Sequence, residues 1–289
     1  MNTRNKKYIF VDIDGTIFDT DGKIPDSAKY AIKQAQINGH EVFICSGRAK
    51  NVMPQNLLDL NFDGLLAGTG TYIEYKNKTI YKNYINKTQI KKVSDLFAKH
   101  KISFMMSSIN HCIASEKTLL DYVKFFTNGE IVLDNINIMK NISIPFLDTL
   151  GEFVIDNDIL SYPKKYDNVN CMVYVYSTLT IDQLNDLLGP DLHVEIASFK
   201  NACPTCGEIT LSECTKSTSI SRLLDFVNAP IESSISIGDG FNDIDMLKFT
   251  NVGIAMGNAH KEVKEIADYV TDDVGKDGLF KAFKHFNLI

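Results

Sequence analysis

The feature of this sequence that most constrains its fold is a set of short apolar runs, each ending in a polar or glycine-bearing loop. Each run is rich in β-branched or aliphatic residues, which is typical of strands buried on both faces of a parallel sheet. The runs are residues 8–11 before Asp12, 42–45 before Ser46, 65–67 before Gly68, and 234–237 before Gly238. They predict one sheet built from both ends of the chain.

Helix patterns lie between these runs. One apolar stripe at helical spacing precedes Gly39, and it consists of Ala28, Ala31, Ile32 and Ala35. A second stripe precedes Pro230, and it consists of Ile220, Leu223, Leu224 and Val227. Strands that alternate with helices form βαβ units with right-handed crossovers. The two ends of the chain therefore predict a Rossmann-like α/β domain.

The middle of the chain has a different pattern. Residues 72–84 resemble a hairpin with its turn at 76–78, and strand-like and helical runs follow as far as residue 188. Strand pairs followed by helices are typical of an α+β domain. We therefore predict a discontinuous α/β core of residues 1–82 and 191–289, with residues 83–190 inserted as an α+β cap.

Composition narrows the class of protein. The 289 residues include 30 Lys and Arg against 36 Asp and Glu, a formal net charge of −6. This balance argues against nucleic acid or an anionic membrane as a partner, because both favour clustered positive charge. No apolar run approaches the roughly eighteen residues of a spanning helix, and six dispersed cysteines do not indicate a disulfide framework. We expect a cytoplasmic protein that acts on a small molecule, and its oligomeric state stays open, a monomer included.

The loops after the predicted strands carry the side chains with chemistry. Carboxyl ends of parallel strands meet at one edge of a sheet, so residues far apart in sequence can share a site there. Asp12 and Asp14 leave the first strand on the same side, and Asp239 and Asp243 follow the last one. Four converging carboxylates favour a hard cation with oxygen ligands, and Mg²⁺ is the one usually coupled to phosphate.

Ser46, Lys216 and the loop amides supply the donor side of this predicted site. The transition state of phosphoryl transfer spreads negative charge over several oxygens, so carboxylates, Mg²⁺, a lysine and hydroxyl donors suit it. The residues therefore predict a phosphoryl-transfer site with Mg²⁺ as its cofactor.

Taken in order, these loops resemble the four motifs of haloacid dehalogenase-like hydrolases (the HAD superfamily). The resemblance is carried by Asp12-Ile13-Asp14-Gly15-Thr16, Ser46-Gly47-Arg48, Lys216 and Gly238-Asp239-Gly240-Phe241-Asn242-Asp243. The insert between the second and third motifs resembles the C2-type cap of the Cof-like, type IIB phosphatases. Residues 252–259 and 277–279 also look like that subfamily, so the resemblance covers essentially the whole chain.

The resemblance implies a role for each motif residue. Asp12 is expected to form an aspartyl-phosphate, with Asp14 as the general acid and base. Phosphate is expected to be bound by Ser46, Gly47, Lys216 and Asn242. Mg²⁺ is expected to be held by Asp12, Asp239, Asp243 and the main-chain carbonyl of Asp14. The active site is expected between the core and the cap.

The implied activity is hydrolysis of a small phosphorylated metabolite, with a sugar phosphate as the expected class. The acid at position 14 favours turnover to phosphate, since family members that store the phosphoenzyme resemble this motif but carry Thr there. Three alternatives stay open: a phosphomutase of the same fold, a non-catalytic sensor of a phosphate ligand, and a zinc-binding interaction module.

Two segments depart from this pattern or suggest other chemistry. Cof-like proteins often have Asn-Gly-Ala where this chain has Gly68-Thr69-Gly70, so the resemblance transfers the mechanism better than the substrate. That loop also lacks the third glycine of a dinucleotide fingerprint, and no nucleotide cofactor is expected. Cys203 and Cys206 have the spacing of a zinc or redox pair, but no second ligand pair lies near, and we interpret them as ordinary cysteines.

Overall fold

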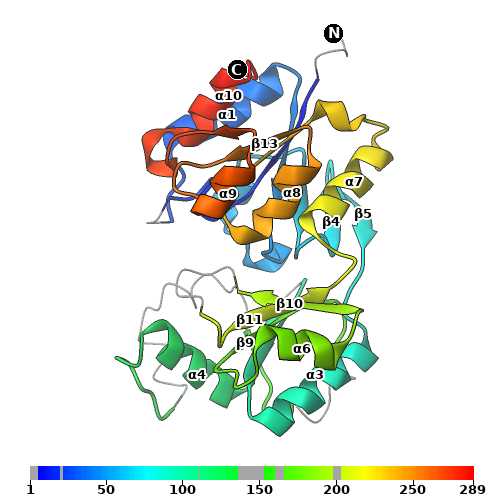
Figure 1. The fold of residues 1–289 in the computed structure, drawn as a ribbon, viewed down its shortest axis with the longest axis vertical. Helices are drawn as coiled ribbons and strands as arrows, with labels where there is room; N and C mark the ends of the chain where they lie inside the picture. Colours follow the sequence, from blue (N-terminus) through cyan, green and yellow to red (C-terminus); the bar gives the residue numbers. More distant parts are fainter. Residues whose placement is uncertain (1–5, 20–21, 110, 136–152, 160–165, 198–202) are drawn as a thin grey trace. The chain divides into compact units, whose positions relative to one another are not determined.

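The computed structural model describes residues 6–19, 22–109, 111–135, 153–159, 166–197 and 203–289. The chain divides into two compact units, each built around its own sheet (Figure 1). Unit 1 comprises Met1–Gly47, Pro54–Lys82 and Cys214–Ile289, and unit 2 comprises Arg48–Met53 and Asn83–Glu213.

Unit 1 contains the predicted parallel sheet. Its strand order is β14-β13-β12-β1-β2-β3-β4-β5. The strands are β1 (Tyr8–Val11), β2 (Glu41–Cys45), β3 (Gly64–Ala67), β4 (Tyr72–Tyr75), β5 (Lys78–Lys82), β12 (Ser234–Gly238), β13 (Val252–Ala255) and β14 (Tyr269–Val270). The strands from β14 to β3 are parallel, and β4 and β5 add an antiparallel edge. The predicted α/β class is confirmed.

The helices of unit 1 pack on this sheet. They are α1 (Asp26–Ile37), α2 (Gln55–Leu58), α7 (Lys216–Phe226), α8 (Ile244–Phe249), α9 (Lys261–Ile266) and α10 (Gly278–His285), with short 3₁₀ turns η5 (Ile231–Ser233), η6 (Phe241–Asp243) and η7 (Val274–Lys276). The predicted stripe of α1 is buried. Helices α7, α8 and α9 contribute side chains to one core cluster with β1, β2 and β3, whereas α1 and α10 lie side by side (Figure 1).

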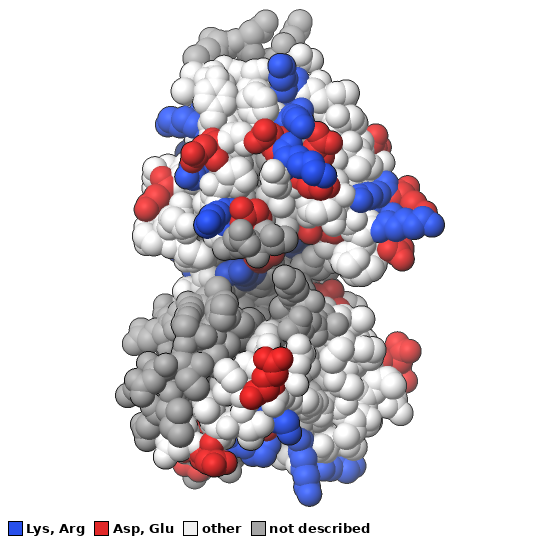
Figure 2. All heavy atoms as spheres, turned by 90° about the vertical axis from the view of Figure 1, so that its left-hand side faces the viewer, with Lys and Arg blue, Asp and Glu red and all other residues white. Residues whose placement is uncertain are grey.

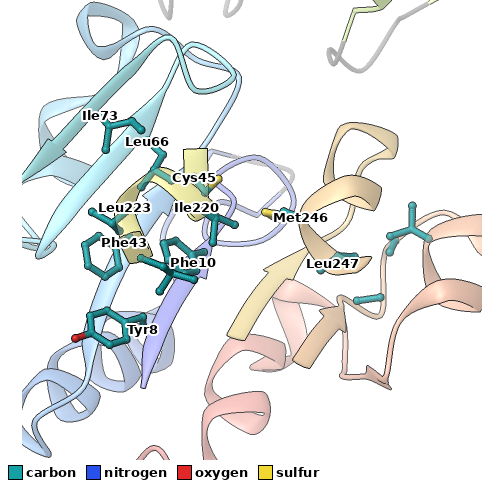
Figure 3. Packing of buried hydrophobic residues seen from close by; sticks show 14 residues of the cluster. Tyr8, Phe10, Phe43, Cys45, Leu66, Ile73, Ile220, Leu223, Met246 and Leu247 are labelled. Carbon is teal, nitrogen blue, oxygen red and sulfur yellow. The ribbon is translucent and has the colours of Figure 1, made fainter. Parts of the chain in front are cut away.

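Aromatic packing holds the centre of unit 1 together. Phe10 of β1 stacks on Phe43 of β2 with ring centroids 5.2 Å apart, and Ile220 and Leu223 of α7 belong to the same cluster (Figure 3). These side chains are fully buried, and burial of each contributes about 1.5–3 kcal/mol relative to exposure. The packing holds α7 against β1 and β2.

Unit 2 is an α+β domain with a six-stranded sheet of order β10-β11-β9-β6-β7-β8. Its strands are β6 (Ser103–Ser108), β7 (Cys112–Ala114), β8 (Phe153–Ile155), β9 (Val169–Val175), β10 (Leu192–Ile196) and β11 (Gly207–Leu211). Its helices are α3 (Lys87–His100), α4 (Glu116–Phe126) and α6 (Ile181–Leu188), and η2 (Lys50–Val52) also belongs to this unit. Phe97 of α3 packs edge-on against Phe104 and Tyr174 of the sheet.

The boundary expected at residue 190 differs from the structure. Strands β10 and β11, which the sequence analysis placed in the core, pair with each other, and β11 pairs antiparallel with β9 of unit 2. The chain therefore returns to unit 1 only at Cys214. The Asn83 side chain donates to Glu213 at 2.6 Å, so the two ends of the insert lie together.

Charged side chains of both signs are interspersed on the face drawn in Figure 2. Several form exposed pairs within one helix or turn, such as Lys91 with Asp95 and Lys276 with Asp273. Such pairs contribute little to stability, because water and salt screen exposed charges. Among the described residues, no helix has the length and apolar character needed to cross a membrane.

Candidate active site

The carboxyl ends of three adjacent strands bring the predicted motifs together. Strand β1 lies between β12 and β2, and each of the three ends at a motif loop. The Asp12 amide donates to the carbonyl of Ile237 at 3.0 Å, which joins the first loop to the last strand. Residues 12 and 239 are therefore neighbours although 227 positions separate them in sequence.

Three carboxylates converge at this edge. Asp12, Asp239 and Asp243 each offer an oxygen that lies within 4.8 Å of the others, and Asp12 and Asp243 are buried. The second oxygen of Asp243, Oδ2, accepts hydrogen bonds from the amides of Asp239 and Gly240 at 2.9 and 2.8 Å. Gly15 allows the loops to approach, because a Cβ there would lie 2.1 Å from Asp239 Oδ2.

Lys216 lies between two of these acids. Its Nζ donates to Asp12 Oδ1 at 2.6 Å and to Asp243 Oδ1 at 2.5 Å, and only 1% of its side chain is exposed. Lys216 is the first residue of α7, where Thr215 caps the helix through the Thr218 amide. A lysine is seldom this deeply buried unless it is paired, so the two carboxylates account for its position.

The charges at this edge act strongly on one another. Burial and the nearby Asp243 carboxylate raise the pKa of Asp12 well above its usual range, although Lys216 opposes the shift. Burial and Asp243 also raise the pKa of Asp239 to about 7, opposed by a hydrogen bond from Thr16. Burial alone would lower the pKa of Lys216, but Asp12 and Asp243 raise it.

The donor set fits a divalent cation. When all three carboxylates are ionised, they and the Lys216 ammonium leave a formal charge of −2 in a largely buried volume. Like charges this close need a counter-ion or a proton, and carboxylate oxygens are ligands that Mg²⁺ prefers.

The other predicted residues lie on the same loops. Ser46 is buried after β2, where its amide donates to the Leu66 carbonyl at 2.9 Å. Gly47 and Asn242 are half-buried. Asp14 is exposed, and its carboxylate is outside the group of three. The expected metal contact of Asp14 through its main-chain carbonyl stays a prediction, as do the phosphate contacts of the other residues.

Asn258 is a site residue that the sequence analysis did not single out. Its Nδ2 donates to the Gly15 carbonyl at 2.8 Å and to Asp239 Oδ2 at 3.2 Å, while its Oδ1 accepts from the Val274 amide at 2.9 Å. It therefore connects the first and fourth motif loops to the turn before α10. Its only signal in the sequence is its place in residues 252–259, which resemble the family.

The loop that departs from the family pattern has a structural explanation. Gly68, Thr69 and Gly70 all have positive φ, at 58°, 53° and 86°. A Cβ at Gly70 would lie 2.7 Å from the Thr215 carbonyl oxygen and 2.8 Å from Ser219 Cβ. The absence of a side chain at Gly70 therefore lets the first turn of α7, and with it Lys216, pack on this loop.

This fold and this arrangement of acids and lysine define a class of hydrolase. The sequence model of the haloacid dehalogenase-like hydrolases matches residues 9–283. The chain belongs to this family, as the motifs indicated. Within the family it is of the Cof-like type with an inserted cap.

Individual relatives extend over the whole chain. The putative phosphatase YkrA of Bacillus subtilis is 28% identical and covers 99% of both chains. The 5-amino-6-(5-phospho-D-ribitylamino)uracil phosphatase YcsE of the same organism is 26% identical over 98% of this chain and 96% of its own length. The solved structure of the HAD subclass IIB sugar phosphatase BT4131 has a TM-score of 0.75 and 26% identity, over 98% of this chain and 100% of that one.

Proposed function

We propose that this protein is a Mg²⁺-dependent phosphatase that hydrolyses a small phosphate monoester through an aspartyl-phosphate on Asp12. The observation that carries the proposal is the buried Lys216 ammonium between Asp12 and Asp243, with Asp239 beside them. A structural ion pair needs one acid for each base, whereas this cluster has two acids in excess. Such an excess suits a site for a divalent cation and a phosphoryl group.

Asp12, Asp239 and Asp243 would hold the Mg²⁺, together with the main-chain carbonyl of Asp14. The bound ion would neutralise charge on the phosphoryl oxygens. Lys216 favours the ionised form of Asp12, the form that acts as nucleophile, through its 2.6 Å contact and so opposes the rise in the pKa of Asp12. A bound cation would favour the same form further. Ser46, Gly47 and Asn242 would donate hydrogen bonds to the phosphoryl oxygens.

Two displacements at phosphorus then follow. A carboxylate oxygen of Asp12 attacks phosphorus, the bond from phosphorus to the ester oxygen breaks, and Asp14 protonates the leaving alkoxide. Asp14 next removes a proton from water, which attacks phosphorus and releases inorganic phosphate and the Asp12 carboxylate. The exposure of Asp14 is compatible with this exchange, since the group must contact both the leaving alcohol and water.

Sugar phosphates are the substrate class we propose first. The named activities of YcsE and BT4131 both concern phosphate esters of polyhydroxylated carbon chains. The shared chemistry is a phosphomonoester on a primary or secondary alcohol. The loop Gly68-Thr69-Gly70 differs from the Asn-Gly-Ala that Cof-like proteins often have there. The substrate therefore transfers less well from the relatives than the mechanism, and a broad range of phosphate esters should be tested.

Phosphate release from a panel of phosphorylated sugars, sugar alcohols and cofactors, with and without Mg²⁺, tests the proposal. We expect Mg²⁺-dependent release of phosphate, and a loss of at least about a thousandfold in Asp12→Asn. The matched control is Asp26→Asn, which changes an exposed aspartate of the same unit. Isomerised sugar phosphate with little free phosphate would indicate a phosphomutase, and binding without turnover would indicate a sensor. Near-normal activity of Asp12→Asn would refute the nucleophile.

A further inference from the structure

The segment Cys203-Pro204-Thr205-Cys206 lies in unit 2, between β10 and β11, and the proposed phosphatase chemistry does not use it. Cys206 donates its amide to the Cys203 carbonyl at 3.0 Å, which closes a tight turn. The Cα atoms of the first and fourth residues of a β-turn lie within about 7 Å. Disulfides require a Cα separation of about 4.4–6.8 Å. The turn therefore holds the two cysteines at a spacing that suits a disulfide.

The second sulfur lies over the backbone of the first cysteine. The Cys203 amide donates to Cys206 Sγ at 3.0 Å, and the Cys206 thiol donates to the Cys203 carbonyl at 3.1 Å. The turn is also anchored from outside, because the Ser177 amide donates to the Thr205 carbonyl at 2.8 Å. These contacts hold both cysteines within one anchored turn.

The two thiols differ in access and in acidity. Cys203 is partly exposed, whereas Cys206 is fully buried. Burial opposes ionisation of Cys203, but hydrogen bonds from Thr205 and Cys206 lower its pKa below the usual thiol value. Burial raises the pKa of Cys206 to about 12. Cys203 is thus the reactive thiol and Cys206 the protected one.

The described residues give no support to a metal at this turn. Neither cysteine belongs to a group of three or more potential ligands within the part of the chain that the structure describes. Both sulfurs form hydrogen bonds within the same four-residue turn. The interpretation of Cys203 and Cys206 as two ordinary cysteines does not account for this arrangement. A dithiol explains the spacing, the asymmetry and the hydrogen bonds together.

We propose that Cys203 and Cys206 form a redox-active dithiol that exchanges with low-molecular-weight disulfides. The Cys203 thiolate attacks one sulfur of the disulfide RSSR, the S–S bond breaks, and RS⁻ leaves. Cys206 loses its proton and attacks Cys203 Sγ, which releases a second RS⁻ and forms the Cys203–Cys206 disulfide. The two cysteines lose two electrons and two protons, and RSSR becomes two RSH.

The test is to incubate the reduced, full-length protein with glutathione disulfide, quench with acid, and map thiols by mass spectrometry. We expect the wild type to form the Cys203–Cys206 disulfide and to retain no glutathione. Cys206→Ser should instead retain glutathione on Cys203, because no second thiol displaces it. Cys203→Ser should retain none, and Cys203 should react at least about tenfold faster than any other cysteine.

Cys206 is buried, so Cys206→Ala is a second variant in case Cys206→Ser folds poorly, and thermal unfolding checks both. Retention of glutathione by the wild type, or an equally fast reaction of Cys206 in Cys203→Ser, would overturn the proposal. Stoichiometric zinc that protects both thiols would do the same. The readout is mass and not turnover, so a failure here leaves the phosphatase proposal standing.

Discussion

At the scale of single residues, the site depends on a lysine whose environment would be unfavourable without its partners. Lys216 is buried with two carboxylates that are buried themselves. Charges are costly to remove from water, and their mutual attraction offsets that cost only when the geometry is close. The distances of 2.6 and 2.5 Å satisfy this condition.

Replacing Lys216 therefore has consequences for stability as well as activity. Lys216→Met should abolish activity and lower the free energy of unfolding of the Mg²⁺-free protein by about 3–5 kcal/mol, because two buried carboxylates lose their counter-charge. Urea unfolding at neutral pH measures the change. The matched control is Lys281→Met, which removes the exposed pair with Asp272 and should cost at most about 1 kcal/mol. Equal effects of both substitutions would contradict the assigned role of Lys216.

The raised pKa of Asp239 predicts how Mg²⁺ binding depends on pH. Metal binding requires the ionised carboxylate, so a proton must leave wherever the pH is below about 7. Affinity for Mg²⁺ should fall at least about tenfold per pH unit below that value, because the pKa of Asp12, a second proposed ligand, is raised as well. Calorimetry at several pH values, in buffers of different ionisation enthalpy, measures both affinity and proton release. Affinity that is constant between pH 6 and pH 8 would contradict this prediction.

The sequence predicts residues best where chemistry restricts the choice of side chain. Asp12 and Asp239 stood in motif loops at strand ends and Lys216 formed the third motif, and the structure brings these three together. Asn258 could not be found in this way, because an exposed asparagine in a turn has many structural uses. Its contacts to Gly15 and Asp239 exist only once the loops have been folded side by side.

At the scale of elements, a glycine controls where α7 begins. Gly70→Ala should displace the first turn of α7 and reduce activity, because its Cβ would lie against the Thr215 carbonyl. Gly39→Ala is a matched control, since Gly39 also has positive φ, 93°, but nothing within 4 Å of its would-be Cβ. Both variants carry the same backbone strain of about 1–2 kcal/mol. Thermal unfolding and phosphate release should therefore separate them, and equal losses of activity would refute the packing argument.

The elements of unit 1 were predictable from local patterns, whereas the end of the insert was not. Short buried strands such as β1 and β12 have continuous apolar runs that end in turn residues, and α1 has a clear stripe. Strand β10 alternates between buried and exposed positions and follows Gly189 and Pro190, as a strand of either domain could. Its membership of unit 2 depends on β11 pairing with β9, more than thirty residues earlier in the chain, which no local pattern encodes.

At the scale of the whole molecule, the insert is continuous in sequence apart from residues 48–53, and its ends lie together. A domain with its own sheet and core can fold alone when its termini are close. We expect residues 83–213, expressed alone, to give a cooperative thermal transition and a dispersed NMR spectrum. The full chain is the control. A fragment without cooperative unfolding would show that unit 2 depends on unit 1.

Transfer of phosphate to Asp12 before water receives it is the central claim. Reacting the protein with a substrate, quenching in acid and reducing with borohydride converts an acyl phosphate into an alcohol, which peptide mass spectrometry locates. We predict homoserine at position 12, in the peptide that includes β1, and none in protein treated without substrate. Reduction at another aspartate, or none at all while phosphate is still released, would contradict the claim.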